Sequence, residues 1–137
     1  MLNASQSQHT LASRFLSDLF GSGVQHIAFA TDDIFATGKR LREGGVELLP
    51  IPENYYDDLE TRIDLPADAI ERLRANNVLY DRQGDAEYFQ SYTRDFDGGF
   101  FFEIVQRRGY AGFGAANAPI RLAAQTRLAR DPAIPRR

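Results

Sequence analysis

The chain has 137 residues, of which 43% are hydrophobic and 26% are charged, and these values are ordinary for one globular domain with a sizeable core. The absence of cysteine excludes disulfides, thiolate metal sites and cysteine nucleophiles, and the net charge of -3 gives no reason to expect a nucleic-acid partner. No apolar run approaches the roughly 20 residues that span a bilayer, and the polar N-terminus lacks the pattern of a signal peptide. We therefore expect a cytoplasmic protein without a membrane partner.

Hydrophobic periodicity and turn residues predict an order of helices and strands along the chain. Thr10 is the expected N-cap of the first helix, and Thr31, Asp32 and Asp33 precede the second helix as cap residues. Pro66 is expected in the first turn of a later helix, where proline is tolerated. In chain order the predicted elements are a helix at 11–19, a strand at 24–30, a helix at 34–42, a strand at 46–51, a helical or turn insertion from 54, a helix at 67–75, strands at 78–81, 86–93 and 100–105, and a helix at 119–130.

This order predicts an α+β fold in which one helix packs on one face of a sheet. The opposite face is apolar as well and carries His26, so it also needs to be covered. Few elements of the chain are left to cover it, and no internal repeat is present that could do so. We therefore expect a second copy of the chain, or a neighbouring module, to close the open face, and we expect the isolated chain to self-associate.

Two segments rich in charge are expected at the surface. Arginine is concentrated in the last third of the chain, where Asp131 is the only acidic residue after Arg107. A solvated face is the ordinary explanation for such a segment, and a docking site for an acidic partner is the alternative. The sequence Tyr-Tyr-Asp-Asp at 55–58 is interpreted as a second surface cluster.

Two distant stretches each carry one metal-type side chain among apolar neighbours: His26 in Gly-Val-Gln-His-Ile-Ala-Phe and Glu103 in Phe-Phe-Phe-Glu-Ile-Val-Gln-Arg. The second stretch does not alternate with polar residues, which predicts a strand that is covered on both faces. A carboxylate in such a strand is costly unless it is paired, hydrogen-bonded or bound to a cation. From the residues alone, His26 is either a satisfied strand histidine or a ligand, and Glu103 is either part of a buried ion pair or a ligand.

Several separated motifs resemble the C-terminal module of the 4-hydroxyphenylpyruvate dioxygenase family. The similarity runs over about residues 2–113, and the ending Gly-Phe-Gly-Ala-Ala-Asn-Ala-Pro-Ile-Arg more closely resembles the dioxygenase-like half of bacterial fusion proteins of the 3-dehydroshikimate dehydratase type. The motifs are Gly-Val-Gln-His-Ile-Ala, Thr-Asp-Asp-Ile, Asn-Tyr-Tyr-Asp-Asp-Leu, Leu-Tyr-Asp-Arg-Gln-Gly and Phe-Phe-Phe-Glu-Ile-Val-Gln-Arg.

The resemblance implies a vicinal-oxygen-chelate fold, that is, a βαβββ module with flanking helices. Within a single domain at 1–137, we expect an N-terminal helical arm at 1–22, the βαβββ module at 23–108, and a gate loop with a C-terminal helix at 109–137. In the family such modules occur in pairs.

The resemblance also implies a metal site at His26 and Glu103, with Fe(II) as the expected divalent metal and Mg, Mn, Co, Ni or Zn as alternatives. A triad of two histidines and one carboxylate leaves open positions on the iron for a 2-oxo acid and O2. In the family the second histidine comes from the preceding module, which this chain does not contain. The source of the third ligand is therefore expected to be another module or another chain.

Further site residues are implied by the same resemblance. Gln25 and Gln90 match catalytic positions, and Tyr92, Phe113 and Asn3 match the pocket for an aromatic 2-oxo acid. Without the family, the two glutamines would simply satisfy backbone groups and the two aromatic residues would simply pack. Ala118 stands where the family gate usually has a second phenylalanine.

Three functions follow from these observations. The first is a non-haem iron oxygenase module of aromatic catabolism that is completed by another module. The second is a non-catalytic domain that serves dimerisation or regulation in a dehydratase fusion. The third is a homodimer in which two histidines and two glutamates hold one metal for isomerase or lyase chemistry.

Overall fold

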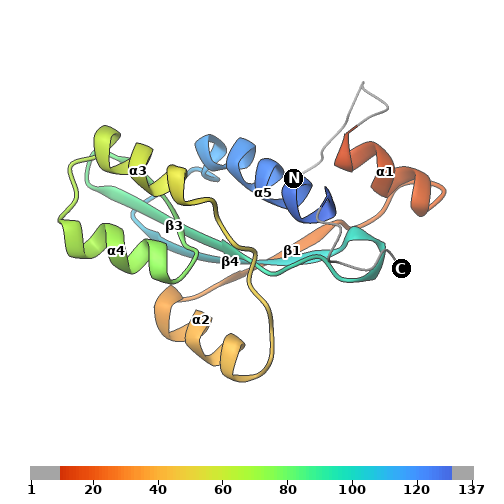
Figure 1. Cartoon of the computed structure of the whole chain (residues 1–137), viewed down its shortest axis with the longest axis horizontal. Helices are drawn as coiled ribbons and strands as arrows, with labels where there is room; N and C mark the ends of the chain where they lie inside the picture. The colour runs from red at the N-terminus through yellow and green to blue at the C-terminus, as the bar shows by residue number, and fades with distance from the viewer. Residues whose placement is uncertain (1–9, 131–137) are drawn as a thin grey trace.

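The structure is a computed structural model that describes residues 10–130 as one mixed sheet with helices on both of its faces (Figure 1). The helices are α1 (Leu11–Asp18), α2 (Ile34–Glu43), α3 (Glu53–Arg62), α4 (Ala67–Ala75) and α5 (Ala118–Arg130). The strands are β1 (His26–Ala30), β2 (Leu79–Gln83), β3 (Ala86–Tyr92) and β4 (Phe101–Arg108), and two short 3-10 turns are η1 (Asp97–Gly99) and η2 (Ala115–Asn117). Within the described range, no helix is long and apolar enough to cross a membrane.

The sheet has the strand order β1-β4-β3-β2, with β1 parallel to β4 and the remaining pairs antiparallel. The first crossover, from β1 through α2 and the α3–α4 insertion, produces the expected βαβββ order. β1 is therefore an edge strand, and it pairs only with β4 among the described strands. This topology places His26 on β1 and Glu103 on the neighbouring strand β4, although the two residues are far apart in the chain.

Helix α2 covers one face of the sheet. Phe35 packs edge-on against Phe89, with ring centroids 6.3 Å apart, and the backbone N–H of Ile34 donates to Oε1 of the buried Gln106 at 3.0 Å. Asp33 is the N-cap, as expected, because its Oδ1 accepts from the backbone N–H groups of Phe35 and Ala36.

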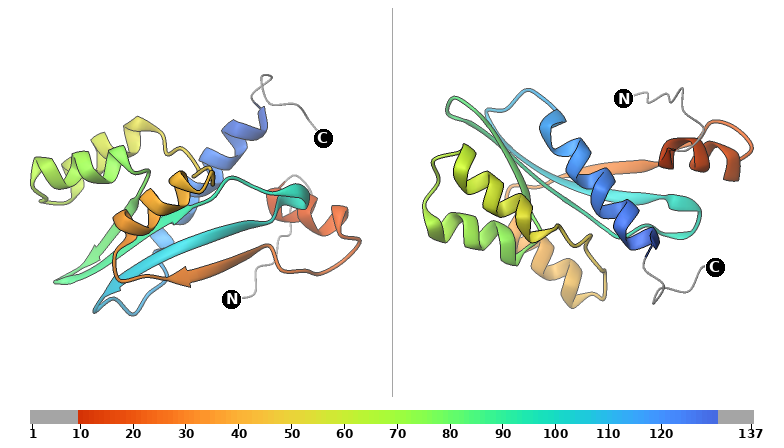
Figure 2. Two further views of the ribbon diagram at one scale, coloured as in Figure 1. Left: turned by 90° about the horizontal axis from the view of Figure 1, so that it is seen from below. Right: turned by 45° about the horizontal axis from the view of Figure 1, so that its top comes forward.

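Helix α5 lies across the opposite face, as the two views of Figure 2 make clear. The guanidinium of Arg121 sits 5.2 Å from the ring centroid of Phe101 and 5.8 Å from that of Tyr92. The expectation that this face has almost no cover within the chain is therefore wrong for β3 and β4. It holds better for β1, whose residues after His26 are all exposed.

The α3–α4 insertion contributes a large part of the core, beside the residues of the sheet. Tyr55 and Tyr56 are 3% and 0% exposed, so the interpretation of residues 55–58 as a surface cluster is wrong for both rings. Their apolar faces pack with Leu59, Ile70 and Leu73 because these positions recur at helical spacing along the inner sides of α3 and α4. Asp57 and Asp58 do point to solvent, where each pairs with an arginine.

The predicted strand at 46–51 is reduced to a single bridge between Leu48 and Thr93. The backbone N–H of Leu49 donates to the carbonyl of Tyr92 at 2.7 Å, but the segment does not continue as a strand. Pro50 and Pro52 have no N–H groups to donate to a ladder, which is the physical reason for the correction.

Candidate metal and substrate site

His26 and Glu103 point to the same side of the sheet, the side that α5 crosses. The parallel register places His26 opposite Phe101 and Ala28 opposite Glu103, so the histidine and the glutamate lie two residues apart on adjacent strands. Nε2 of His26 is 3.5 Å from Oε2 of Glu103. The imidazole also stacks on Phe101, with ring centroids 5.1 Å apart and planes 3° apart, and this contact orients it toward the carboxylate.

The other carboxylate oxygen of Glu103 is held by two donors from β3. Nε2 of Gln90 donates to Oε1 at 2.8 Å, and the hydroxyl of Tyr92 donates to the same oxygen at 3.2 Å. Both donors face Glu103 because the antiparallel register pairs Tyr92 with Glu103 directly. Oε2 is therefore left facing His26, while Oε1 is occupied by the protein's own hydrogen bonds.

The environment of Glu103 favours its charged form. Burial raises the pKa of the carboxyl, but His26, Gln90 and Tyr92 together outweigh burial and lower the pKa of Glu103 below its ordinary value. Burial and the adjacent Glu103 raise the pKa of Tyr92 well above its ordinary value, so the phenol stays protonated and continues to donate. Tyr88 lies two positions before Gln90 on β3. Burial is the main cause that raises the pKa of Tyr88 to about 12.

The donor pair fits a divalent cation with small adjustment. If a cation lay about 2.1 Å from both Nε2 of His26 and Oε2 of Glu103, the angle at the cation between these two bonds would be about 110°, close to the tetrahedral angle. An octahedral angle of about 90° would need the two atoms to approach by about 0.5 Å. Imidazole and carboxylate are a suitable pair for Fe(II), Zn or Mn, but residues 10–130 contain no group of three or more metal-type side chains.

A buried chain of hydrogen bonds extends from Glu103 to helix α3. Nδ2 of Asn117 donates to Oε1 of Gln90 at 2.8 Å, and the Tyr55 hydroxyl lies 3.2 Å from Oδ1 of Asn117. The backbone N–H of Tyr80 donates to the Tyr55 oxygen at 2.8 Å. The Gln90 amide thus receives at its oxygen and donates from its nitrogen, which leaves one orientation that satisfies both partners.

Gly114 allows the loop before α5 to approach this chain of hydrogen bonds closely. Its φ of 63° lies in the left-handed region, and a Cβ at this position would overlap Oε1 of Gln90 and the ring of Tyr88. Glycine at position 114 therefore has a packing reason, because only glycine permits both the conformation and the contact.

Within residues 10–130, the structure shows no side-chain contact between the remaining predicted site residues and the pair His26 and Glu103. Gln25 precedes β1 and accepts from the backbone N–H of Phe101 through its carbonyl, but its side chain makes no hydrogen bond to the described residues. Phe113 is 65% exposed, and its ring lies 5.7 Å from the guanidinium of Arg107 at the end of β4. Asn3 lies outside the described residues. The metal-binding and catalytic roles assigned from the sequence stay predictions.

Three residues at the site were missed by sequence reasoning: Tyr55, Asn117 and Arg121. Arg121 was grouped with the solvated arginines of the last third, although it is half-buried against aromatic rings. A signal did exist for Asn117, because an asparagine directly after a glycine- and alanine-rich loop is well placed to satisfy buried groups. Nothing in the local pattern connected Tyr55 to residue 117.

Residues 2–104 match the Glyoxalase/Bleomycin resistance protein/Dioxygenase superfamily. The chain is 51% identical to a 3-dehydroshikimate dehydratase of Pseudomonas aeruginosa over 94% of its own length and 21% of that protein. It is 38% identical to a 4-hydroxyphenylpyruvate dioxygenase of the same organism over 85% of its own length and 33% of that protein. These matches confirm the resemblance seen in the sequence motifs.

A solved structure described as a xylose isomerase-like TIM barrel/4-hydroxyphenylpyruvate dioxygenase fusion protein is similar to the chain, with a TM-score of 0.74 and 54% identity. The alignment covers 77% of this chain and 17% of that structure. The chain therefore spans about a fifth of the length of the dehydratase and fusion relatives and a third of the dioxygenase.

Proposed function

The chain belongs to the glyoxalase/bleomycin resistance protein/dioxygenase superfamily, and from this premise we propose that it is the metal-binding module of an oxygenase resembling 4-hydroxyphenylpyruvate dioxygenase. His26 and Glu103 supply two ligands to a divalent cation, expected to be Fe(II). A histidine from another module or chain supplies the third. The substrate class is an aromatic 2-oxo acid, with O2 as the second reactant.

The observation that carries this proposal is the arrangement of the two carboxylate oxygens of Glu103. Oε1 is held by Gln90 and Tyr92, and Oε2 is turned toward Nε2 of His26 at 3.5 Å. A structural ion pair would need only the histidine. Here two neutral donors, Gln90 and Tyr92, also hold Oε1, and they orient the carboxylate so that Oε2 is available to a metal ion. The bound metal would supply coordination of the 2-oxo acid and activation of O2.

The chain's own residues prepare this site. Gln90 and Tyr92 keep Glu103 ionised and oriented, and Phe101 keeps the imidazole in the plane that faces the carboxylate. The rings of Tyr92 and Phe101 lie on the same face and are buried, at 5% and 1% exposed, so they support the site from within the core. Phe113, from the loop before α5, is 65% exposed and would contact an aromatic substrate from the solvent side.

Titration of the metal-free chain with Co(II) by calorimetry under argon tests the ligand assignment. We expect saturable binding at one ion per chain, lost in His26→Ala and in Glu103→Gln. The matched control is Glu47→Gln, because Glu47 is an exposed carboxylate that pairs with Arg94 at 2.8 Å. Wild-type affinity in both ligand variants would contradict the proposal. Oxygen uptake with 4-hydroxyphenylpyruvate then tests the substrate class.

A second candidate is a non-catalytic domain within a dehydratase-type fusion. The 51% identity to a protein named 3-dehydroshikimate dehydratase, of which the chain spans only 21%, favours it. This candidate predicts no stoichiometric metal and no oxygen uptake.

The third candidate, a homodimeric metal centre, is favoured by the exposed β1 edge that carries His26. It predicts one ion for every two chains, together with a dimer in light scattering at micromolar concentration. The Co(II) stoichiometry therefore separates all three candidates.

A further inference from the structure

We propose that a cavity beside the C-terminal end of α5 binds a small neutral aromatic molecule that carries one hydrogen-bond donor, such as a phenol. The cavity has a volume of about 500 Å³, which is within the range of about 300–1,000 Å³ that is usual for small-molecule sites. It lies between the loop after α2, the segment after β3 and the last turns of α5, and its lining includes neither His26 nor Glu103. The proposal goes beyond the proposed function and does not rest on it.

Apolar side chains make up much of the cavity wall. Phe96 is 50% exposed, and its ring packs edge-on against Phe102 with centroids 5.6 Å apart. Val46 and Leu128 add aliphatic side chains to the same lining. An exposed phenylalanine ring beside two aliphatic side chains gives an aromatic ligand a surface to pack on.

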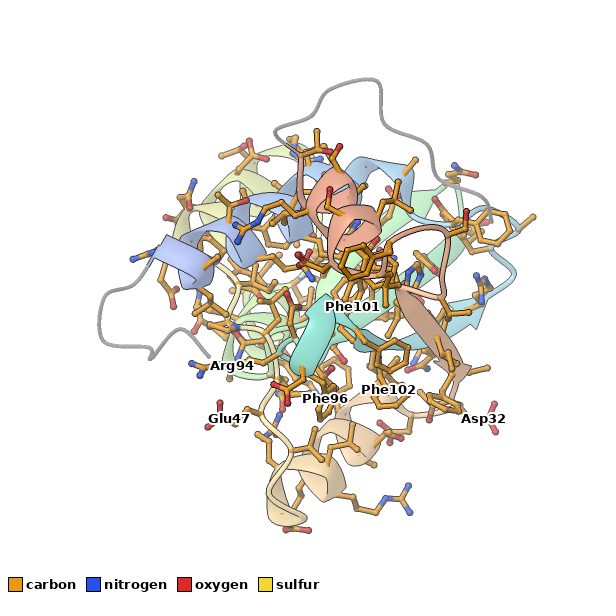
Figure 3. The ribbon with its side chains drawn as sticks, turned by 90° about the vertical axis from the view of Figure 1, so that its right-hand side faces the viewer. Asp32, Glu47, Arg94, Phe96, Phe101 and Phe102 are labelled. Carbon is orange, nitrogen blue, oxygen red and sulfur yellow. The ribbon has the colours of Figure 1, made fainter. Side chains whose placement is uncertain are left out.

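The charged groups of the cavity already have partners of opposite charge. Nη1 of Arg94 pairs with Oε2 of Glu47 at 2.8 Å, and both residues reach outward at the edge of the molecule (Figure 3). The carboxylate of Asp95 interacts electrostatically with Arg121, and Gln125 bonds to both of them. A charged ligand would bring an additional charge without a partner, whereas a neutral ligand leaves both pairs intact.

A relay of hydrogen bonds determines which oxygen of Asp95 is available to a ligand. Nη1 of Arg121 donates to Oε1 of Gln125 at 2.7 Å, so the Nε2 end of this amide is the end that faces Asp95. Nε2 donates to Oδ1 of Asp95 at 2.9 Å, and Gln125 is only 5% exposed. Within residues 10–130, Oδ2 of Asp95 makes no hydrogen bond, so it is the oxygen that a ligand can contact.

This free oxygen selects the polar group of the ligand. An ionised carboxylate only accepts hydrogen bonds, so the group that meets Oδ2 has to be a donor. The hydroxyl of a phenol is a neutral donor on an aromatic ring, whereas the corresponding methyl ether has no donor. We expect the discrimination between them to be moderate, because Asp95 is an exposed residue that water also reaches.

The first experiment follows the backbone amide signals of Gly45 and Val46 by NMR while the full chain is titrated with 4-ethylphenol or 4-ethylanisole. Both residues line the cavity. We expect saturable shifts with both probes, and at least about 5-fold higher affinity for the phenol, because only the phenol donates to Asp95. Equal affinity for the two probes, or no shift with either, would overturn the proposal.

Two variants and a control test the role of Asp95 and of the cavity. In Asp95→Asn, Gln125 continues to donate to Oδ1, so an NH2 group replaces Oδ2 and the preference for the phenol should disappear. Asp97→Asn, at an exposed aspartate outside the lining, should keep the wild-type preference. Ala129→Phe should weaken both probes, because the added ring fills the cavity from α5. A preference that persists in Asp95→Asn, or unchanged affinities in Ala129→Phe, would overturn the proposal.

The second experiment excludes other binding places and other occupants. His26→Ala should leave the affinity for 4-ethylphenol unchanged, and a loss of binding would assign the probe to the candidate metal site. Signals of Gly45 and Val46 that respond to protein concentration and not to the probe would assign the cavity to a second copy of the chain. Arg136→Gln combined with Arg137→Gln changes the chain end outside the described residues, and shifts of the same signals without any probe would assign the cavity to that end. Each of these three results would overturn the proposal.

Discussion

The two faces of the sheet treat buried polar groups differently. On the face covered by α2, the buried Gln106 bonds to a backbone group, the N–H of Ile34 at the start of a helix. On the face crossed by α5, the buried Gln90 bonds only to side chains, those of Glu103, Tyr92 and Asn117. The first glutamine completes a fold element, and the second orients a carboxylate. A buried amide that serves other side chains is the better indicator of a site.

The aromatic residues of β1 and β4 also have different partners on the two faces of the sheet. Phe29, Phe96, Phe100 and Phe102 cluster around the α2-side end of these strands, and Figure 3 shows Phe96 and Phe102 together on one side of β4 with Phe101 on the other. These four phenylalanine rings contact one another. On the Phe101 side the rings support His26 and Arg121, so the aromatic residues there have polar partners to position.

If the two faces have separate roles, core packing on the α2 side should control stability and not the metal site. Ile104→Ala should lower the free energy of unfolding by about 2–5 kcal/mol, because it leaves a cavity beneath α2. Co(II) affinity should be unchanged at temperatures where the variant is folded. Ile27→Ala, at 44% exposure on the same face, is the control and should cost much less in urea denaturation. A large loss of Co(II) affinity in folded Ile104→Ala would refute the separation of the two faces.

Replacement of the glutamine that serves the fold should affect stability alone. In Gln106→Leu the backbone N–H of Ile34 loses its acceptor, which should cost about 1–3 kcal/mol in the free energy of unfolding. Gln83→Leu, at an exposed glutamine whose Nε2 makes only a 3.4 Å hydrogen bond to the Tyr110 hydroxyl, should cost much less. Chemical denaturation of the two variants measures the difference. Equal stability in both would show that Gln106 has no structural role.

Replacement of Asn117, which bonds both Gln90 and Tyr55, should affect the metal site as well as stability. Asn117→Ala removes the donor that orients the Gln90 amide, so Co(II) affinity should fall about 10- to 100-fold. Asn54→Ala, at an exposed asparagine of α3, provides the control. The Co(II) absorption spectrum should also change in Asn117→Ala, since Glu103 would no longer be held in one orientation. An unchanged spectrum with unchanged affinity would remove Asn117 from the site.

The smallest effect should be a pH dependence of stability that originates from Glu103. Its pKa is lower in the folded chain than its ordinary value, so its contribution to stability is present above about pH 4.3 and is lost as the pH falls through the folded pKa. Without metal, the difference in unfolding free energy between wild type and Glu103→Gln should therefore shrink as the pH is lowered below 4.3. Parallel pH profiles for the two proteins would show that the hydrogen bonds to Glu103 are not formed in solution.

Much of the fold was predictable from local pattern. The capping residues Thr10 and Asp33 marked helix starts correctly, because a cap depends on neighbours within one turn. Pro66 is the N-cap of α4, one position before the place in the first turn that was expected for it. The segment at 46–51 was misjudged because its apolar content favoured a strand, while its prolines left too few N–H groups for a ladder. Tyr55 and Tyr56 were misjudged because adjacent aspartates suggested solvent on all sides of a helix that has one buried face.

The sequence by itself determined the pair His26 and Glu103 as the centre of interest, because a carboxylate and an imidazole inside apolar strands require an explanation wherever those strands lie. Only the tertiary structure decided that they face each other, since strand register, and not chain distance, sets which side chains meet. It also decided that Asn117 and Arg121 join them. Asn117, in the turn η2, and Arg121, in α5, make these contacts on one face of the sheet, and the local sequence of neither indicates its partner.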